Sequence, residues 1–186
     1  MTTDAQQWTW SRESGGSLTM VCPAPETLAG LAEAMAGVLA PGDLVLLHGE
    51  LGAGKTTLTQ HLARALGVGD DQYVSSPSFA LVHEYRGRLP MVHMDLYRLA
   101  DEDDVEAAGV LEYLDQPAVI VIEWPDRLGS LTPDERLEIR LECASPDLRR
   151  LILTPQGANW PRKIDRIAER LAHATAAQAN NQPGRR

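Results

Sequence analysis

The amino-acid sequence predicts an α/β fold, and three observations lead to that prediction. Short apolar runs of strand length alternate along the chain with segments whose apolar residues recur at helical spacing. The strongest run, residues 117–124 (PAVIVIEW), is continuously apolar up to an acid, as expected for a central strand. A glycine-rich turn, residues 48–57 (HGELGAGKTT), joins one predicted strand to the helix that follows it.

The first half of the chain predicts strand, helix, strand, helix and then a pair of strands, in that order: residues 17–22, 23–42, 43–49, 56–67, 77–85 and 91–97. Apolar residues one turn apart, such as Leu58 and Leu62, place one face of the fourth element against a core. The last pair alternates with a period of two, and the sequence RGRLP between its members favours a turn.

The second half predicts a helix at residues 100–114 and the central strand at 117–124. A pair of antiparallel strands towards the sheet edge follows at 137–143 and 148–154. A last helix is predicted after residue 160, where Ile164, Ile167 and Leu171 recur at helical spacing. Asp101 is expected to cap the first of these helices, and the acidic run from Asp101 to Asp104 suits its positive end. That run favours a solvated helix start, with a partner contact as the alternative.

Length and composition predict a single domain over residues 18–172, between a flexible N-terminus at 1–17 and a disordered tail at 173–186. The formal net charge of −9 argues against a broad basic face that would grip a nucleic acid backbone. Cys22 and Cys143 lack metal-ligand spacing and are expected to be buried small apolar residues in a reducing compartment. With no apolar run long enough to span a bilayer and no secretory signal, we expect a cytoplasmic protein without membrane contact.

The glycine-rich turn carries the clearest chemical pattern in the chain. Gly49, Gly54, Lys55 and Thr56 satisfy G-x-x-x-x-G-K-[ST]. Glycines let successive backbone N–H groups turn inward around phosphate oxygens, and the following helix directs its positive end at the same place. Lys55 would reach the β- and γ-phosphates, and the Thr56 hydroxyl would take one Mg²⁺ position. The pattern therefore predicts a nucleoside triphosphate site.

A magnesium-dependent phosphate site needs a second strand that delivers an acid. Glu123 ends the strongest apolar run, and Asp95 ends a less apolar one. One of the two would hold the metal, directly or through water, and the other would orient the attacking water. The alternative for each is a strand-end acid that is solvated or pairs with an arginine such as Arg98.

Other residues near the predicted site allow two readings each. Ser75, Ser76 and Ser78 flank Pro77 where nucleotide-dependent proteins often place a loop that senses the γ-phosphate, or their hydroxyls cap local backbone groups. Trp124 is either core packing or a wall beside the nucleotide.

The histidines are not spaced as a metal cluster. His83 and His93 could meet across the predicted hairpin, and together with His48 they are expected to have structural or hydrogen-bonding roles.

Four stretches in this order, GELGAGKTT, SSPSFALV, HMDLYRL and VIEWPDR, resemble the TsaE family, also called the YjeE family. The resemblance covers residues 18 to about 155. Members are bacterial ATPases of the machinery that makes threonylcarbamoyladenosine on tRNA. The resemblance implies a three-layer P-loop NTPase fold, with a central mixed sheet flanked by helices, and it implies ATP and Mg²⁺ as the bound groups.

The resemblance also implies roles for residues at the matching positions. Lys55, Asp95 and Glu123 would be catalytic, and Thr56 and Glu123 would hold the metal. Ser76, Pro77, Ser78 and Phe79 match the family's S-P-T-[FY] switch loop, with Ser78 in place of threonine. The implied ATP-binding residues are Glu50, Leu51, Gly52, Ala53, Gly54, Lys55, Thr56, Thr57 and Trp124.

For the function, the resemblance implies a subunit that works through partners. A TsaD-like subunit paired with a TsaB-like protein would transfer threonylcarbamoyl to an adenosine next to the anticodon. This chain would hydrolyse ATP and reset that complex, and tRNA would be met indirectly through it. The acidic net charge agrees with that arrangement.

Three other functions remain open from the residues alone. A small-molecule kinase needs a closing lid with arginines. Close to the motif region only Arg86 and Arg88 form a pair in an exposed turn, and no inserted lid is visible between the core elements. A GTPase is disfavoured because a short D-x-x-G at 126–129 has no N-K-x-D beside it. A non-catalytic module that binds nucleotide and is read by a partner is close to the favoured function.

Overall fold

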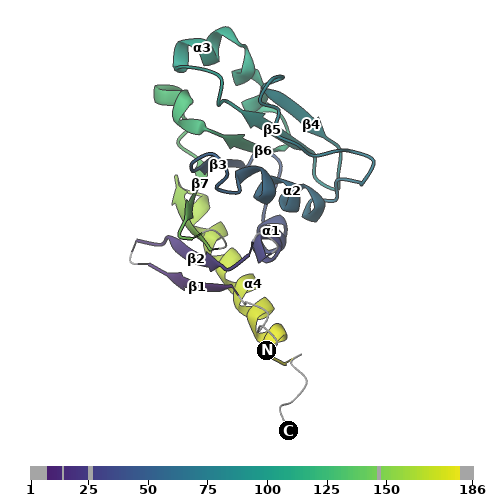
Figure 1. Ribbon diagram of the computed structural model, residues 1–186, viewed down its shortest axis with the longest axis vertical. Coiled ribbons are helices and arrows are strands. Elements are labelled where there is room, and N and C mark those ends of the chain that lie inside the picture. The colour runs from purple at the N-terminus through teal and green to yellow at the C-terminus, as the bar shows by residue number, and fades with distance from the viewer. Residues whose placement is uncertain (1–7, 14, 25–26, 146–147, 181–186) are drawn as a thin grey trace.

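A mixed sheet of eight strands runs through the middle of the part of the chain that the computed structural model describes, residues 8–13, 15–24, 27–145 and 148–180. The strands are ordered β1-β2-β8-β7-β3-β6-β5-β4, so β1 and β4 are the two edges of the sheet, and they lie far apart in Figure 1. Their bounds are β1 (Thr9–Arg12), β2 (Leu18–Cys22), β3 (Leu44–His48), β4 (Val82–Tyr85), β5 (Met91–Asp95), β6 (Val119–Glu123), β7 (Arg136–Cys143) and β8 (Arg149–Gln156).

The centre of the sheet is parallel, and this decides where a site can form. β3 pairs in parallel with β6 and β7, and β6 pairs in parallel with β5. β4, β8, β2 and β1 add antiparallel strands on the two sides. The carboxyl ends of the four parallel strands therefore meet at one edge, where open α/β sheets place their ligands.

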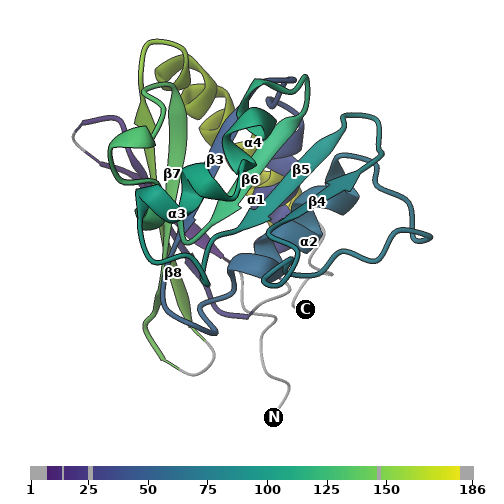
Figure 2. The same cartoon turned by 90° about the horizontal axis from the view of Figure 1, so that it is seen from above.

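Helices cover both faces of the sheet (Figure 2), which confirms the predicted three-layer α/β fold. One face carries α1 (Leu28–Ala36), α2 (Lys55–Ala65) and α4 (Trp160–Asn180). The other carries α3 (Glu102–Ala107) and two short 3₁₀ segments, η2 (Val110–Asp115) and η3 (Pro125–Leu131).

The alternation of buried residues along β3 shows why its sequence is continuously apolar. Val45 and Leu47 pack with α1, α2 and α4, whereas Leu44 and Leu46 pack with α3 and the 3₁₀ segments. All four side chains are almost completely buried. A strand covered on both faces has no polar side to present, so the pattern of period two disappears.

Two predicted ends of the domain were wrong within the described residues. Part of the N-terminus expected to be flexible forms β1, because it pairs with β2 over four residues and Trp8 is buried in the core beside it. The tail expected to be disordered from residue 173 instead continues α4 to Asn180, since its alanine-rich sequence favours a helix. Residues 1–7 and 181–186 lie outside the described part of the chain.

Three details of the predicted elements also differ. The hairpin of β7 and β8 lies inside the sheet, because β7 pairs with β3 and β8 with β2. The strand expected from residue 77 begins only at Val82, because Leu81 has a positive φ of 65° and donates its N–H to the Pro77 carbonyl at 2.6 Å. The helix expected over 100–114 divides at Gly109 into α3 and η2, and Asp101 caps α3 as predicted.

Candidate functional site

The glycine-rich turn lies between the carboxyl end of β3 and the first turn of α2. At Gly49 the backbone has a φ of 148°, and a Cβ built there would lie 2.6 Å from the carbonyl oxygen of Leu141 in β7. Only glycine fits both conditions. Gly54, also with a positive φ, precedes the first residue of the 11-residue helix α2. The turn therefore presents backbone to the edge of the sheet, with the positive end of α2 directly behind it.

Lys55 has its charge held inside this turn. Its side chain is only 4% exposed, and Nζ donates to the carbonyl oxygens of Gly49 at 2.7 Å and Glu50 at 3.0 Å. Nζ also lies 4.0 Å from the ring centre of Trp124. Burial lowers the pKa of Lys55, while the nearby carboxylates of Glu123 and Asp95 act in the opposite direction. The cation is positioned to exchange the two carbonyl oxygens for those of an anionic ligand.

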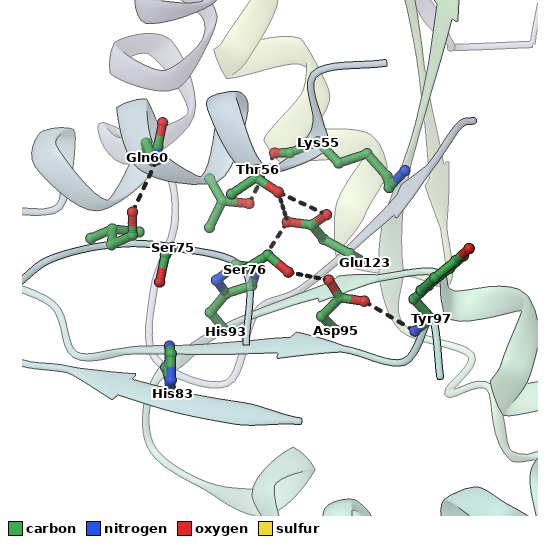
Figure 3. A network of polar contacts seen from close by, with 12 residues as sticks. Lys55, Thr56, Gln60, Ser75, Ser76, His83, His93, Asp95, Tyr97 and Glu123 are labelled. Atoms are coloured by element: carbon green, nitrogen blue, oxygen red, sulfur yellow. Dashed lines mark hydrogen bonds and ion pairs between the residues drawn. The ribbon is translucent and has the colours of Figure 1, made fainter. Parts of the chain in front are cut away.

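Thr56 and Glu123 meet directly below the turn, as the dashed contacts in Figure 3 show. The Thr56 hydroxyl donates to both carboxylate oxygens of Glu123, at 2.8 Å and 3.1 Å. Glu123 is the last residue of β6 and is 2% exposed. Since Leu47 of β3 is its partner in register, the ladder itself brings the acid beside the helix that starts after β3.

Asp95 is the partner in register of Glu123 on the next strand, so the two acids lie side by side on the face towards α2. Asp95 is 3% exposed and accepts a hydrogen bond from the Tyr97 N–H at 3.0 Å. It also accepts one from the Ser76 hydroxyl. Of the two readings of the serine loop, local backbone capping and a role at the site, the Ser76 contact favours the second.

An open hollow of about 350 Å³ joins most of the residues that the sequence predicts for the site. It is lined by Leu51, Gly52, Gly54, Lys55, Thr56, Thr57, Ser76, Ser78, Asp95, Tyr97, Arg98, Glu123 and Trp124. Phe79 is 84% exposed and lies beside the hollow, with the Arg98 guanidinium 3.8 Å from its ring centre. Arg98, suggested as a partner for the acids, therefore contacts an aromatic ring of the serine loop.

A second hollow of about 590 Å³ lies on the other side of the turn, at the carboxyl end of β7. Leu51 and Trp124 line both hollows. The remaining residues are Gly49, Glu50, Ala53, Asp126, Arg140, Leu141, Glu142 and Cys143. The lining residues of β7 were not predicted as site residues, because the sequence of residues 137–143 (LEIRLEC) does not indicate that this strand pairs with β3. The signal that exists is general: the ends of parallel strands share one edge.

The prediction that both cysteines are buried was right for Cys22 and wrong for Cys143. Cys22 is buried as expected, and burial raises the pKa of its thiol to about 11. Cys143 is exposed, because it is the last residue of β7 and the sheet ends there.

The histidines have the hydrogen-bonding environments expected of them. His83 and His93 are partners in register across the β4–β5 hairpin, as predicted. His93 Nε2 lies 3.0 Å from a Glu123 oxygen, and His48 Nδ1 lies 3.2 Å from Asp126. In the described ranges of the chain, no helix has the length and apolar character needed to cross a bilayer.

The sequence matches, over residues 22–152, the family described as "Threonylcarbamoyl adenosine biosynthesis protein TsaE". A similar protein of Bacillus subtilis (strain 168), named tRNA threonylcarbamoyladenosine biosynthesis protein TsaE, is 40% identical over 137 residues, 73% of this chain and 84% of that protein. A protein of the same name from Streptomyces coelicolor is 39% identical over 70% of this chain and 91% of its own. The crystal structure of Bacillus subtilis YdiB superposes with a TM-score of 0.68 at 30% identity, covering 90% of this chain and 98% of that one.

Proposed function

This chain belongs to the TsaE family, and from that premise we propose that it is a Mg²⁺-dependent ATPase that acts in the formation of threonylcarbamoyladenosine on tRNA. The match to the family spans most of the folded chain, and it includes the glycine-rich turn, Asp95, Glu123 and Trp124. The single observation that supports this best is the direct contact of Thr56 with Glu123 beneath the glycine-rich turn. It joins a hydroxyl and a carboxylate at the place where a triphosphate would end.

The residues present fit a magnesium ion. Mg²⁺ prefers oxygen ligands, binds through few protein groups and keeps several waters or phosphate oxygens. The Thr56 hydroxyl and the Glu123 carboxylate offer such oxygens within 3.1 Å of each other. When bound, the ion would neutralise charge that develops on the phosphate oxygens.

The other residues would bind and orient. Lys55 would leave the carbonyl oxygens of Gly49 and Glu50 for the β- and γ-phosphates, where its charge offsets theirs. Asp95 would accept a hydrogen bond from the attacking water and hold it in line with the γ-phosphate. Through Ser76 the serine loop is tied to Asp95, which supports a switch whose position depends on the nucleotide.

The nucleoside would extend from the turn into the second hollow. That hollow begins at Gly49 and Glu50 and is bordered by the Trp124 ring. An indole at the border of this hollow suits a purine base, since aromatic rings stack. Glu50, Leu51 and Ala53 would therefore contact the ligand on the side away from Asp95.

The partners we propose are a TsaD-like transferase subunit and a TsaB-like subunit, whose complex ATP hydrolysis would reset. A net charge of −9 supports contact with tRNA through those partners, because 26 acidic side chains outnumber 17 basic ones and oppose binding to a phosphate backbone.

The test is phosphate release from ATP, measured with the chain alone and with the TsaB–TsaD-like pair from the same source. We expect slow release alone, acceleration by the pair and loss of release when magnesium is chelated. The label of γ-labelled ATP should appear as free phosphate, whereas a labelled acceptor would favour a kinase. Absence of both ATP binding and stimulation by the pair would contradict the proposed function.

A further inference from the structure

His93 is a buried imidazole whose role the proposed ATPase chemistry leaves unassigned. It lies in β5 between Met91 and Asp95 and is completely buried on the face towards α2. Val121 of β6 is its partner in register, two residues before Glu123. In Figure 3 the ring lies below the Glu123 carboxylate, opposite Thr56.

The contact between the two residues has a defined direction. An ionised carboxylate only accepts hydrogen bonds, so His93 Nε2, 3.0 Å from Glu123 Oε1, carries the hydrogen and donates it. Oε1 also accepts from Thr56, whereas Oε2 accepts from Thr56 at the longer distance of 3.1 Å. His93 of β5 thus holds the carboxylate through Oε1, and Oε2 keeps a lone pair that a metal ion could use.

The rest of the imidazole does not explain its presence. Within the described residues, Nδ1 is buried without a hydrogen-bond partner. Burying a polar ring costs free energy that an apolar side chain in the same strand would avoid. The ring therefore makes one polar contact in this part of the chain, and that contact is to the acid at the centre of the site.

We propose that His93 is a positioning residue whose Nε2–H holds the Glu123 carboxylate in the orientation that binds the metal of the metal–nucleotide complex. Groups that hydrogen-bond a metal ligand from behind fix its direction, and their loss commonly weakens metal binding 10–100-fold. The inference rests on the proposed function, since it takes Glu123 as a metal ligand.

The experiment compares His93→Leu, which removes the donor at similar volume, with His93→Gln, whose amide nitrogen can occupy the place of Nε2. The Mn²⁺ affinity of each protein–ADP complex is measured by electron paramagnetic resonance of free Mn²⁺. ADP affinity in EDTA and the melting temperature are measured alongside. Thr59→Val is the matched control, because within the described ranges its buried hydroxyl bonds the Lys55 carbonyl of its own helix and no site residue's side chain.

We expect His93→Leu to weaken Mn²⁺ binding about 10–100-fold, while ADP affinity in EDTA stays within about threefold. His93→Gln and Thr59→Val should bind Mn²⁺ like the wild type. If His93→Leu does not fold, His93→Asn takes its place, since its shorter amide cannot reach Glu123 and should weaken Mn²⁺ binding where His93→Gln does not.

Wild-type Mn²⁺ affinity in His93→Leu or His93→Asn would overturn the proposal, as would equal loss in His93→Gln. These outcomes leave nucleotide binding in EDTA intact and so spare the proposed function. A wild-type protein that binds no ADP at all would instead overturn the nucleotide site and the role of His93 with it.

Discussion

Lys55 combines a nearly buried ammonium group with partners that a ligand can replace. Its two hydrogen bonds go to carbonyl oxygens of the turn, and its third neighbour is the face of Trp124. Burial lowers the pKa of this lysine because water no longer stabilises the charge. A triphosphate restores that stabilisation, so binding requires the protonated form.

We therefore expect ATP affinity to fall as the pH rises through the lowered pKa of Lys55, below the ordinary lysine value near 10.5. Lys55→Arg should lose this pH dependence because the guanidinium stays charged. Lys55→Met should bind ATP about 10–100-fold more weakly at neutral pH, since it lacks a charge-assisted hydrogen bond. Calorimetric titrations from pH 7 up to the ordinary lysine value near 10.5 check both, and constant wild-type affinity over that range would contradict the expectation.

The stability of the nucleotide-free protein should change with pH in the opposite direction to ATP affinity. Between the lowered folded pKa and the unfolded value, the unfolded chain binds more protons at Lys55 than the folded one does. The free energy of unfolding without nucleotide then rises with pH in that window. Comparing denaturant unfolding of the wild type with that of Lys55→Met isolates this contribution, which the variant should lack.

Glu123 should separate turnover from binding. Glu123→Gln keeps the shape and the contact with Thr56 but removes the negative charge that a metal needs. We expect ATP hydrolysis with the partner pair to fall at least about 100-fold, while nucleotide affinity in EDTA changes less than about threefold. Glu84→Gln, at an exposed position of β4, is the control. Equal turnover of Glu123→Gln and wild type would remove Glu123 from the site.

At the scale of single residues, local sequence patterns indicated which side chains lie together at the carboxyl ends of the strands. Lys55 and Thr56 follow from one contiguous pattern, and Glu123 and Asp95 follow from strand ends. The contact of His93 with Glu123 could not be predicted, because it depends on β5 and β6 being neighbours, which no local pattern states.

At the scale of the elements, the neighbouring strand β7 constrains the glycine-rich turn at Gly49. Gly49→Ala would combine a φ that L-residues avoid with a Cβ 2.6 Å from the Leu141 carbonyl. We expect it to lower the free energy of unfolding by roughly 3 kcal/mol or more and to impair ATP binding.

Gly52→Ala is the matched control, with a positive φ of 80° but open space around the added carbon. Conformational strain alone should cost it about 1–2 kcal/mol. Chemical denaturation and nucleotide titration of both variants give the comparison. Equal stability of the two would show that the contact with β7 does not constrain the turn.

The elements show where prediction from the sequence stops. β3, β6 and α2 were found because their apolar patterns are strong. β1 was missed because an edge strand needs only one partner and carries few apolar residues. The order of the strands could not be predicted, because it depends on contacts between residues far apart in the sequence. Val45 of β3 and Leu137 of β7, for example, are partners in register about ninety positions apart.

For the molecule as a whole, α4 completes the larger core and does not form an appendage. Trp160, Ile164 and Ile167 are almost fully buried against the sheet face that α1 and α2 also cover. Stability, and with it the nucleotide site, therefore depends on a helix that lies after the stretch of residues matched by the family.

Ile164→Ala should lower the free energy of unfolding by about 2–4 kcal/mol, because it leaves a cavity in a closely packed core. Arg166→Ala, exposed on the same helix, should change it by less than about 0.5 kcal/mol. Thermal unfolding followed by circular dichroism measures both. A stable Ile164→Ala with normal ATP binding would mean that α4 does not contribute to the fold of the site.

The pairing of Asp95 with Glu123 across β5 and β6 sets a rule for the insertions and deletions that this chain can accept. Successive side chains on a strand point to opposite faces, so deleting one residue inside either strand would turn one acid away from α2. The exposed turn at Ala108 and Gly109, between α3 and η2, lies outside that ladder and can change in length without disturbing its phase. Tolerance to length variation should thus be high in that connection and, within the two strands, restricted to even numbers of residues.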